Sequence, residues 1–194
     1  MDWESTVDES LRSLRDVVGH LRPDDWARPT PCGEWNVTQV LQHAAGDQLG
    51  WASAMTGGPK PGFDPFAPSG TIDGDPLAFL DIALDASVDA WSKVAHDQVA
   101  VVTPLPQGPL PAEVAAGACA LDAAVHAWDI AVATRQPEPI GEHLAVLLLA
   151  VAREVVEPLR DWGAYAPALA PLADDSQRAA LLRYLGRNPG WTPA

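Results

Sequence analysis

The sequence predicts an all-α protein: a four-helix bundle with long crossover connections and a short C-terminal helical extension. Apolar residues recur at helical spacing in several segments, and stretches rich in proline and glycine separate these segments. No series of alternating apolar and polar residues indicates a sheet. A chain of 194 residues, 47% hydrophobic and 20% charged, is long enough for one well-packed core.

Five long helices and one short helix are expected in chain order, each bounded by residues that start or stop helices. The long helices cover about Glu4–Leu21, Val37–Met55, Pro76–Gln98, Pro111–Thr134 and Gly141–Arg160. The short helix covers Ser176–Leu185 and stops at Gly186. Asn36 and Gln39 have the spacing of a capping box at the start of the second helix. The apolar face of the third helix is expected to hold Leu80, Ile82, Leu84, Val88 and Trp91.

Two connections are long enough to shape a site. The segment 23–35 contains Trp26 and Trp35 and is expected to be an ordered connector pinned by these aromatic side chains. Thr56–Gly74 is rich in Gly, Pro, Ser and Asp and predicts a long loop, of the kind that often covers a site. A single domain is expected, with the bundle over residues 1–160 and the extension over residues 161–194 packed on it.

Charge and composition exclude several functions. The net charge of -14, from 26 acidic and 12 basic residues, comes without any local cluster of Lys and Arg, so neither nucleic acid nor an anionic membrane is an expected partner. The longest apolar stretch, Leu144–Ala152, is shorter than the ~20 residues that cross a bilayer. The acidic N-terminus lacks the pattern of a secretory signal, and two cysteines are few for a disulfide scaffold. We therefore expect a cytoplasmic protein.

The residues with metal-binding chemistry lie in two predicted helices. Asp122 and His126 are one helical turn apart, so their side chains project from the same face, as two ligands of one ion must. His43 lies among apolar residues of the second helix, where a buried imidazole needs a partner. Two imidazoles and one carboxylate leave a coordination position open, which suits catalysis. Zn²⁺ is the first expectation, and Ni²⁺, Fe²⁺ or Co²⁺ would accept the same donors.

Three further residues near these ligands are candidates for supporting roles. Asp47 follows His43 by one turn, Cys119 precedes Asp122 on the same face, and Asp129 follows His126 by about one turn. Each also has an ordinary interpretation: a solvated carboxylate for Asp47, a small core residue for Cys119, and a cap of a neighbouring segment for Asp129. Likewise, Asp122 and His126 have the spacing of a simple surface pair.

Three motifs resemble a known family. They are Thr30-Pro-Cys-Gly-Glu-Trp35 before the helix with His43, the later His126-Ala-Trp-Asp129, and Leu185-Gly-Arg-Asn-Pro-Gly-Trp191. In combination they resemble the DinB-like superfamily, and more closely its actinobacterial branch, represented by the N-terminal domain of mycothiol-dependent maleylpyruvate isomerase. The resemblance implies a bundle that holds a divalent metal through one His and a later Glu/His pair. The matching positions here are His43, Asp122 and His126, with Asp122 one methylene shorter than the family's Glu.

The resemblance and the open coordination position together predict a metal-dependent enzyme that activates a small thiol. Mycothiol or a similar thiol would be the co-substrate of a transferase or isomerase, with a small electrophile as the second partner. Maleylpyruvate isomerisation itself is not expected, because that isomerase has a further C-terminal domain. The alternatives are a metal-dependent hydrolase that uses metal-bound water, with Asp47 or Asp129 as base, and a non-catalytic metal-binding stress-response module. A homodimer through bundle helices is a further expectation.

Overall fold

Helices make up the regular secondary structure of the protein over the residues that the computed structural model describes: 3–33, 35–95 and 98–193. They are α1 (Trp3–Gly19), the 3-10 helix η1 (Pro23–Asp25), α2 (Val37–Thr56), α3 (Pro76–Trp91), α4 (Ala112–Ala133), α5 (Glu142–Arg160) and α6 (Gln177–Tyr184). Within those ranges the only β-structure is a pair of isolated bridges, Pro29 with Asn36 and Val101 with Leu110. The predicted all-α class is confirmed.

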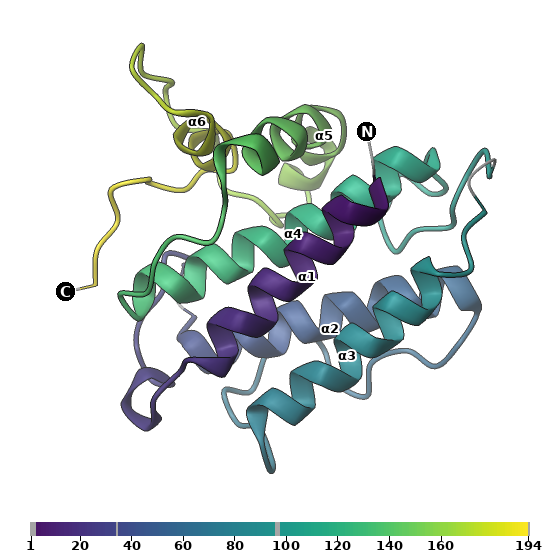
Figure 1. The fold of residues 1–194 in the computed structure, drawn as a ribbon, viewed down its shortest axis with the longest axis horizontal. Helices are drawn as coiled ribbons and strands as arrows, with labels where there is room; N and C mark the ends of the chain where they lie inside the picture. Colours follow the sequence, from purple (N-terminus) through teal and green to yellow (C-terminus); the bar gives the residue numbers. More distant parts are fainter. Residues whose placement is uncertain (1–2, 34, 96–97, 194) are drawn as a thin grey trace.

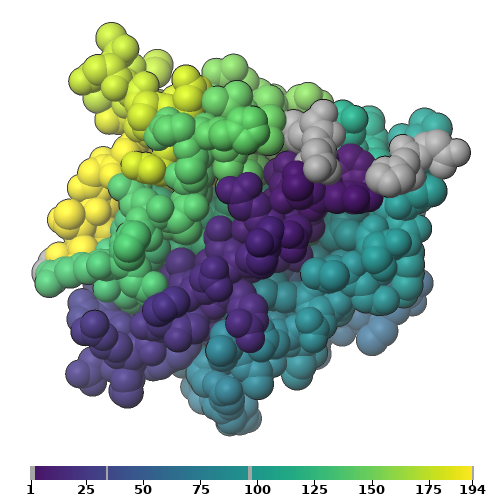
Figure 2. All heavy atoms as spheres, in the orientation of Figure 1, coloured from purple at the N-terminus to yellow at the C-terminus, as the bar shows by residue number. Residues whose placement is uncertain are grey.

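Helices α1 to α4 form the bundle (Figure 1). α1 packs against α4 and α3, and α2 packs against the same two helices, so each helix has two neighbours. α5 packs on α4, and α6 packs on α5, on the side away from α2 and α3. The space-filling view shows α1 running diagonally between the surfaces of α4 and α3 (Figure 2). The predicted four-helix bundle with a C-terminal helical extension is therefore confirmed.

α4 is the central helix and is buried on nearly every side. Among the described helices it alone has the length and apolar composition that would suffice to cross a membrane, but 89% of its most apolar window is buried inside the protein, as in a core helix. Gly117 allows α5 to approach, because a Cβ at this position would lie 2.4 Å from Val151 Cγ2. Because α4 is so closely surrounded, its side chains can form a site only where a neighbouring helix leaves room.

The predicted capping box at the start of α2 is present. Gln39 N donates to Asn36 Oδ1 over 3.0 Å, and Asn36 N donates to Gln39 Oε1 over 3.1 Å. Two backbone donors at the helix start are thus satisfied. This fixes the first turn of α2, which precedes His43 on the same helix.

The predictions for α3 are partly wrong. The helix ends at Trp91 rather than near Gln98, and its last turn tightens: Lys93 N donates to Ala90 O and Val94 N donates to Trp91 O, each three residues back. Leu80, Leu84 and Trp91 are buried as expected, but Ile82 and Val88 are 67% and 52% exposed. The buried face instead includes the small residues Ala83 and Ser87, which are in helical phase with Leu80 and Leu84 and let α3 pack closely on its neighbours.

Candidate metal centre

The three residues proposed as ligands meet between α2 and α4. One donor atom each from His43, Asp122 and His126 lie within 4.8 Å of one another. His126 Nε2 lies 3.4 Å from Asp122 Oδ1, and the two imidazole rings are 4.8 Å apart, nearly perpendicular. Both imidazoles are buried, and Asp122 is partly exposed. Two nitrogen donors and one oxygen donor, from helices far apart in the sequence, thus face a common point.

Hydrogen bonds orient both imidazoles towards that point. His43 Nδ1 lies 2.9 Å from Pro65 O, and His126 Nδ1 lies 3.1 Å from Asp129 Oδ2. A carbonyl and a carboxylate only accept, so Nδ1 carries the hydrogen in each ring. With Nδ1 protonated, Nε2 is the atom that presents a lone pair to an ion once the ring is neutral.

The carboxylate of Asp129 is held in turn by an arginine from the C-terminal tail. Arg187 Nε donates to Asp129 Oδ1 over 2.9 Å, and Arg187 Nη2 donates to Asp129 Oδ2 over 2.8 Å. Burial would raise the pKa of Asp129, but Arg187 and His126 lower it to about 2. Asp129 is therefore ionised, and this bidentate pair fixes the plane in which it accepts from His126. Cys32 also approaches His126 and Asp129.

On the other side, Asp122 is supported by Gln48. The Gln48 amide nitrogen lies 3.4 Å from Asp122 Oδ2, while its oxygen accepts from Ser87 Oγ over 2.8 Å and from Cys119 Sγ over 3.2 Å. Two donors on the oxygen leave the NH₂ group facing Asp122. Burial raises the pKa of Cys119 to about 12, so this thiol stays protonated and donates. The structure thus places Cys119 beside Gln48, within the hydrogen-bond network behind Asp122.

The titration behaviour of the cluster separates its two histidines. Burial, together with the charge of His126, lowers the pKa of His43 to about 4. Burial also acts to lower the pKa of His126, but hydrogen bonds to Asp122 and Asp129 outweigh it and the pKa is raised well above its ordinary value. Without an ion, His43 is neutral at pH 7 and His126 carries the proton.

Asp47 lies at the edge of the cluster. Its Oδ2 is 3.5 Å from His43 Nε2. Burial and the charge of Asp122 raise the pKa of Asp47 well above its ordinary value. A carboxyl group that keeps its proton more readily than usual therefore stands beside the common point.

The loop after α2 covers His43. Gln39 and Gln42 tie it down through Gln39 Nε2 to Pro68 O over 3.2 Å and Gln42 Nε2 to Thr71 O over 2.8 Å. Gly46 permits this close approach, since a Cβ there would lie 2.5 Å from Pro65 Cβ. One face of α2 therefore holds the loop, and the Pro65 carbonyl that orients His43 comes from it.

The connector before α2 places an aromatic ring beside the same histidine. Thr30 Oγ1 donates to Trp35 O over 2.8 Å and accepts from Cys32 N over 3.1 Å, which closes a tight turn. The Trp35 ring then lies 4.8 Å from the ring of His43. The ordered connector that was predicted is thus present, with Glu34 of the motif outside the described residues.

Sequence reasoning missed several residues that surround the ligands. Pro65 acts through its backbone carbonyl, which leaves no side-chain signal. Gln48 is fully buried, but it differs from an ordinary helix residue only in that burial. Arg187 lies inside the C-terminal motif Leu185–Trp191, but its ion pair with Asp129 was not predicted. Only long-range packing reveals these roles.

The fold and the cluster between α2 and α4 define a DinB-like helical-bundle protein. The crystal structure of the mycothiol-dependent maleylpyruvate isomerase superposes with a TM-score of 0.67 over 97% of this chain and 90% of that chain, at 15% identity. A histidine-to-alanine mutant of the isomerase superposes with a TM-score of 0.63 over 93% and 86% of the two chains, at 14% identity. These similarities establish the shared fold.

The chain belongs to the family of the mycothiol maleylpyruvate isomerase N-terminal domain, whose family model matches residues 7–131. An uncharacterized protein of Mycobacterium tuberculosis, found in two strains, is 32% identical over 151 residues, which cover 73% of this chain and 72% of that protein. The structural match spans most of the solved isomerase chain.

Proposed function

We propose that this protein is a divalent-metal-binding, thiol-dependent enzyme of the transferase or isomerase type, with mycothiol or a similar small thiol as co-substrate. The observation that carries the proposal is the convergence of His43, Asp122 and His126 donors within 4.8 Å, with both Nδ1 atoms engaged elsewhere. Membership of a family named for a mycothiol-dependent isomerase supports the thiol.

The donor set fits a divalent ion of the zinc type. His43 and His126 would supply Nε2, and Asp122 would supply a carboxylate oxygen, which leaves room for an exogenous ligand. When bound, such an ion lowers the pKa of a coordinated thiol or water and so provides a nucleophile near neutral pH. We expect Zn²⁺ first, while Ni²⁺, Fe²⁺ or Co²⁺ would use the same donors.

The residues around the ligands have separate tasks in this proposal. Asp129, held by Arg187, keeps the Nδ1 hydrogen of His126 in place and so aims its Nε2. Asp47 Oδ2, 3.5 Å from His43 Nε2, is the site that would exchange the proton of an arriving thiol, because a carboxyl group whose pKa is raised holds a proton more readily than usual. Trp35 and the exposed ring of Phe66, 5.4 Å from the His43 ring, would line the entrance.

Elemental analysis of the purified protein tests the ligand set. The wild type should retain close to one divalent ion per chain, while His43→Ala and His126→Ala should each lose it. His143→Ala is the matched control, because His143 is an exposed histidine at the start of α5, outside the cluster. Full retention of metal by both cluster variants would refute the site.

A thiol titration tests the reaction class. The metal-loaded protein is titrated with a small thiol by calorimetry, alongside the corresponding alcohol. The thiol should bind and release a proton, which shows as a dependence of the measured heat on the buffer, and the alcohol should not. If other small ligands bind the metal-loaded protein and thiols do not, the thiol-dependent assignment fails while the metal site stands.

A metal-dependent hydrolase is the second candidate, and Asp47 favours it. The same raised pKa would let Asp47 act as base towards a water molecule. Asp129 is less suited to this role, since Arg187 engages both of its oxygens. Turnover of an ester or amide panel without added thiol, lost in Asp47→Asn, would favour the hydrolase over the thiol-dependent enzyme.

Three coarser expectations accompany the proposal. The protein would act in the cytoplasm, where reduced thiols are abundant. It would form a homodimer through bundle helices, which sedimentation velocity would measure. The bundle over residues 1–160 would form one unit with the extension 161–194 packed on it, and limited proteolysis would report whether the extension is released first.

A further inference from the structure

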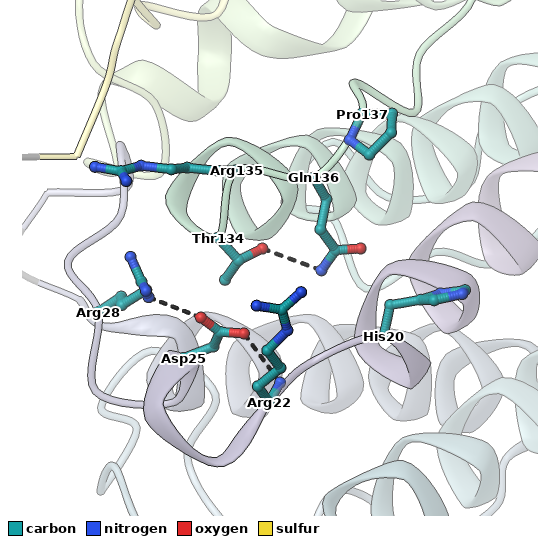
Figure 3. A pocket seen from close by; sticks show the side chains of 8 residues that line it. All are labelled: His20, Arg22, Asp25, Arg28, Thr134, Arg135, Gln136 and Pro137. Carbon is teal, nitrogen blue, oxygen red and sulfur yellow. Dashed lines mark hydrogen bonds and ion pairs between the residues drawn. The ribbon is translucent and has the colours of Figure 1, made fainter.

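A second concave site lies at one end of the bundle, where α1 and α4 finish (Figure 3). The pocket has a volume of about 650 Å³, and its lining includes the three arginines Arg22, Arg28 and Arg135 together with His20. Arg22 and Arg28 follow α1, whereas Arg135 follows α4. Residues distant in sequence therefore build a cationic cluster that no local stretch of the chain contains.

This cluster is unusual for a chain with a net charge of -14. Most of the lysines and arginines lie within 4.0 Å of a carboxylate, as acidic excess would favour. Among the described residues, those with no such ion pair are Arg22, Lys60, Arg135 and Arg153. Two of these four line the pocket. The pocket thus gathers cations that form no ion pair with the carboxylates of the described residues.

The one carboxylate in the pocket lining is already engaged. Asp25 Oδ1 lies 2.7 Å from Arg28 Nε, and Asp25 Oδ2 accepts from Arg22 N over 2.9 Å. The Asp25 side chain is only 8% exposed. In Figure 3 the only interaction drawn between Arg22 and this carboxylate is made by the Arg22 backbone nitrogen, and the guanidinium forms no ion pair with it. The Asp25 carboxylate is therefore occupied by the Arg22 backbone N–H and by the Arg28 side chain. The side chains of Arg22 and Arg135 remain available to a ligand.

Arg135 occupies a position that the backbone does not favour for arginine. It follows the end of α4 with a φ of 59°, the left-handed region. Arg135 N donates to Val132 O and Gln136 N donates to Ala131 O, which together form the helix-ending motif that usually places glycine at this position. The local fold would accept glycine more readily than arginine. The residue in this position nevertheless carries a charged side chain, and it is one of those that line the pocket.

We propose that this pocket binds the oxyanion group of a small anionic ligand, such as a phosphate monoester or a dicarboxylate. Guanidinium groups match both, because their fixed N–H donors pair with two oxygens at once. Thr134, in the lining, is eight residues beyond His126, so the pocket lies roughly 12 Å along α4 from the candidate metal centre. It is a separate site and does not depend on the proposed thiol-dependent function.

The test is a titration of ¹⁵N-labelled protein with inorganic phosphate, and separately with succinate, at constant ionic strength, with chloride as the control anion. Saturable shifts are expected for the backbone amides of Arg22, Thr134 and Gln136, and the tighter of the two anions identifies the oxyanion. Shifts that concentrate at His43 and His126 would instead mean that the anion binds at the metal centre, and would overturn the proposal.

Two variants and a matched control locate the site. Arg22→Gln and Arg135→Gly should each weaken phosphate binding by about tenfold or more, because each removes a charged hydrogen-bond donor. Arg153→Gln, on the surface of α5, removes an exposed arginine that likewise forms no ion pair with a described carboxylate and should leave the affinity unchanged.

Arg135→Gly also separates binding from folding. Its melting temperature should equal that of the wild type or exceed it by about 2–4 °C, since glycine relieves the left-handed backbone. Weaker binding with undiminished stability would support a ligand role for Arg135. Equal affinities for wild type, Arg22→Gln and Arg135→Gly, or an absence of saturable shifts with either anion, would show that the pocket does not bind oxyanions.

Discussion

The cluster between α2 and α4 and the arginine-lined pocket at the end of the bundle handle charge in opposite ways. In the cluster, Asp129 has a bidentate arginine and a histidine, and Asp122 has a histidine and an amide. In the pocket, Arg22 and Arg135 have no described carboxylate partner. Buried charges must be paired because leaving one unpaired costs several kcal/mol, whereas exposed charges remain hydrated at little cost.

In the two regions, different features mark a place for a ligand. In the buried cluster, hydrogen bonds fix the orientation of each side chain. The atoms that these bonds leave available to an ion are Nε2 of His43 and Nε2 of His126. In the arginine-lined pocket the charges are exposed and do not require a partner for stability. A group of like charges there indicates a place for an oppositely charged ligand.

Removing the arginine that pairs with Asp129 should have the largest effect on stability. Arg187→Ala removes both guanidinium hydrogen bonds from the buried carboxylate of Asp129 and leaves it with His126 alone, and we expect the free energy of unfolding to fall by about 3–5 kcal/mol. Urea unfolding of the metal-free protein measures it. Arg153→Ala is the control, since this exposed arginine on α5 should change stability by less than about 0.5 kcal/mol. Similar losses in the two variants would contradict the buried pair.

Neutralising Asp129 should weaken the proposed metal site without removing a ligand. In Asp129→Asn the amide no longer supplies a charged acceptor to His126 Nδ1, and metal affinity should fall about 10- to 100-fold. Competition with a chelating dye measures the change. Asp161→Asn, at the end of α5 and exposed, should leave affinity unchanged. An unaltered affinity in Asp129→Asn would mean that His126 needs no such support.

The same carboxylate should set part of the acid stability. The pKa of Asp129 is lowered from 3.8 to about 2 in the folded protein, so its stabilising effect is complete above pH 4 and is lost as pH falls towards 2. Wild type should therefore lose about 2 kcal/mol more than Asp129→Asn between pH 5 and pH 2. Urea unfolding at several pH values with a chelator present measures it. Parallel curves would show that Asp129 is not selectively stabilised in its charged form.

Relieving the left-handed backbone conformation of Arg135 should have the smallest effect on stability, and this effect should be an increase. Arg135→Gly should stabilise the protein by about 1 kcal/mol or less, because glycine adopts this backbone conformation without a steric penalty. Thermal unfolding checks the sign. Arg135→Ala keeps a Cβ and should gain nothing, so equal gains in the two variants would rule out the backbone as the cause.

Sequence reasoning reached furthest where structure is local. The capping box of Asn36 and Gln39 and the one-turn spacing of Asp122 and His126 depend on neighbours a few residues away, and both geometries are present. It was wrong where a helix face depends on its neighbours: Ile82 and Val88 are exposed because α3 buries smaller residues instead. Hydrophobicity alone does not say which face the partner helix covers.

The sequence was sufficient for the helical class, for the helix starts and most helix ends, and for the residue types available for a metal site, because these follow from local propensity and periodicity. Only the tertiary structure decided which atoms face one another. Arg187 pairs with Asp129, 58 residues away in the sequence. Arg22 and Arg135 line the same pocket although a long stretch of chain separates them. Burial sets these partnerships, because a charge removed from water must find its partner in space, wherever that partner lies in the chain.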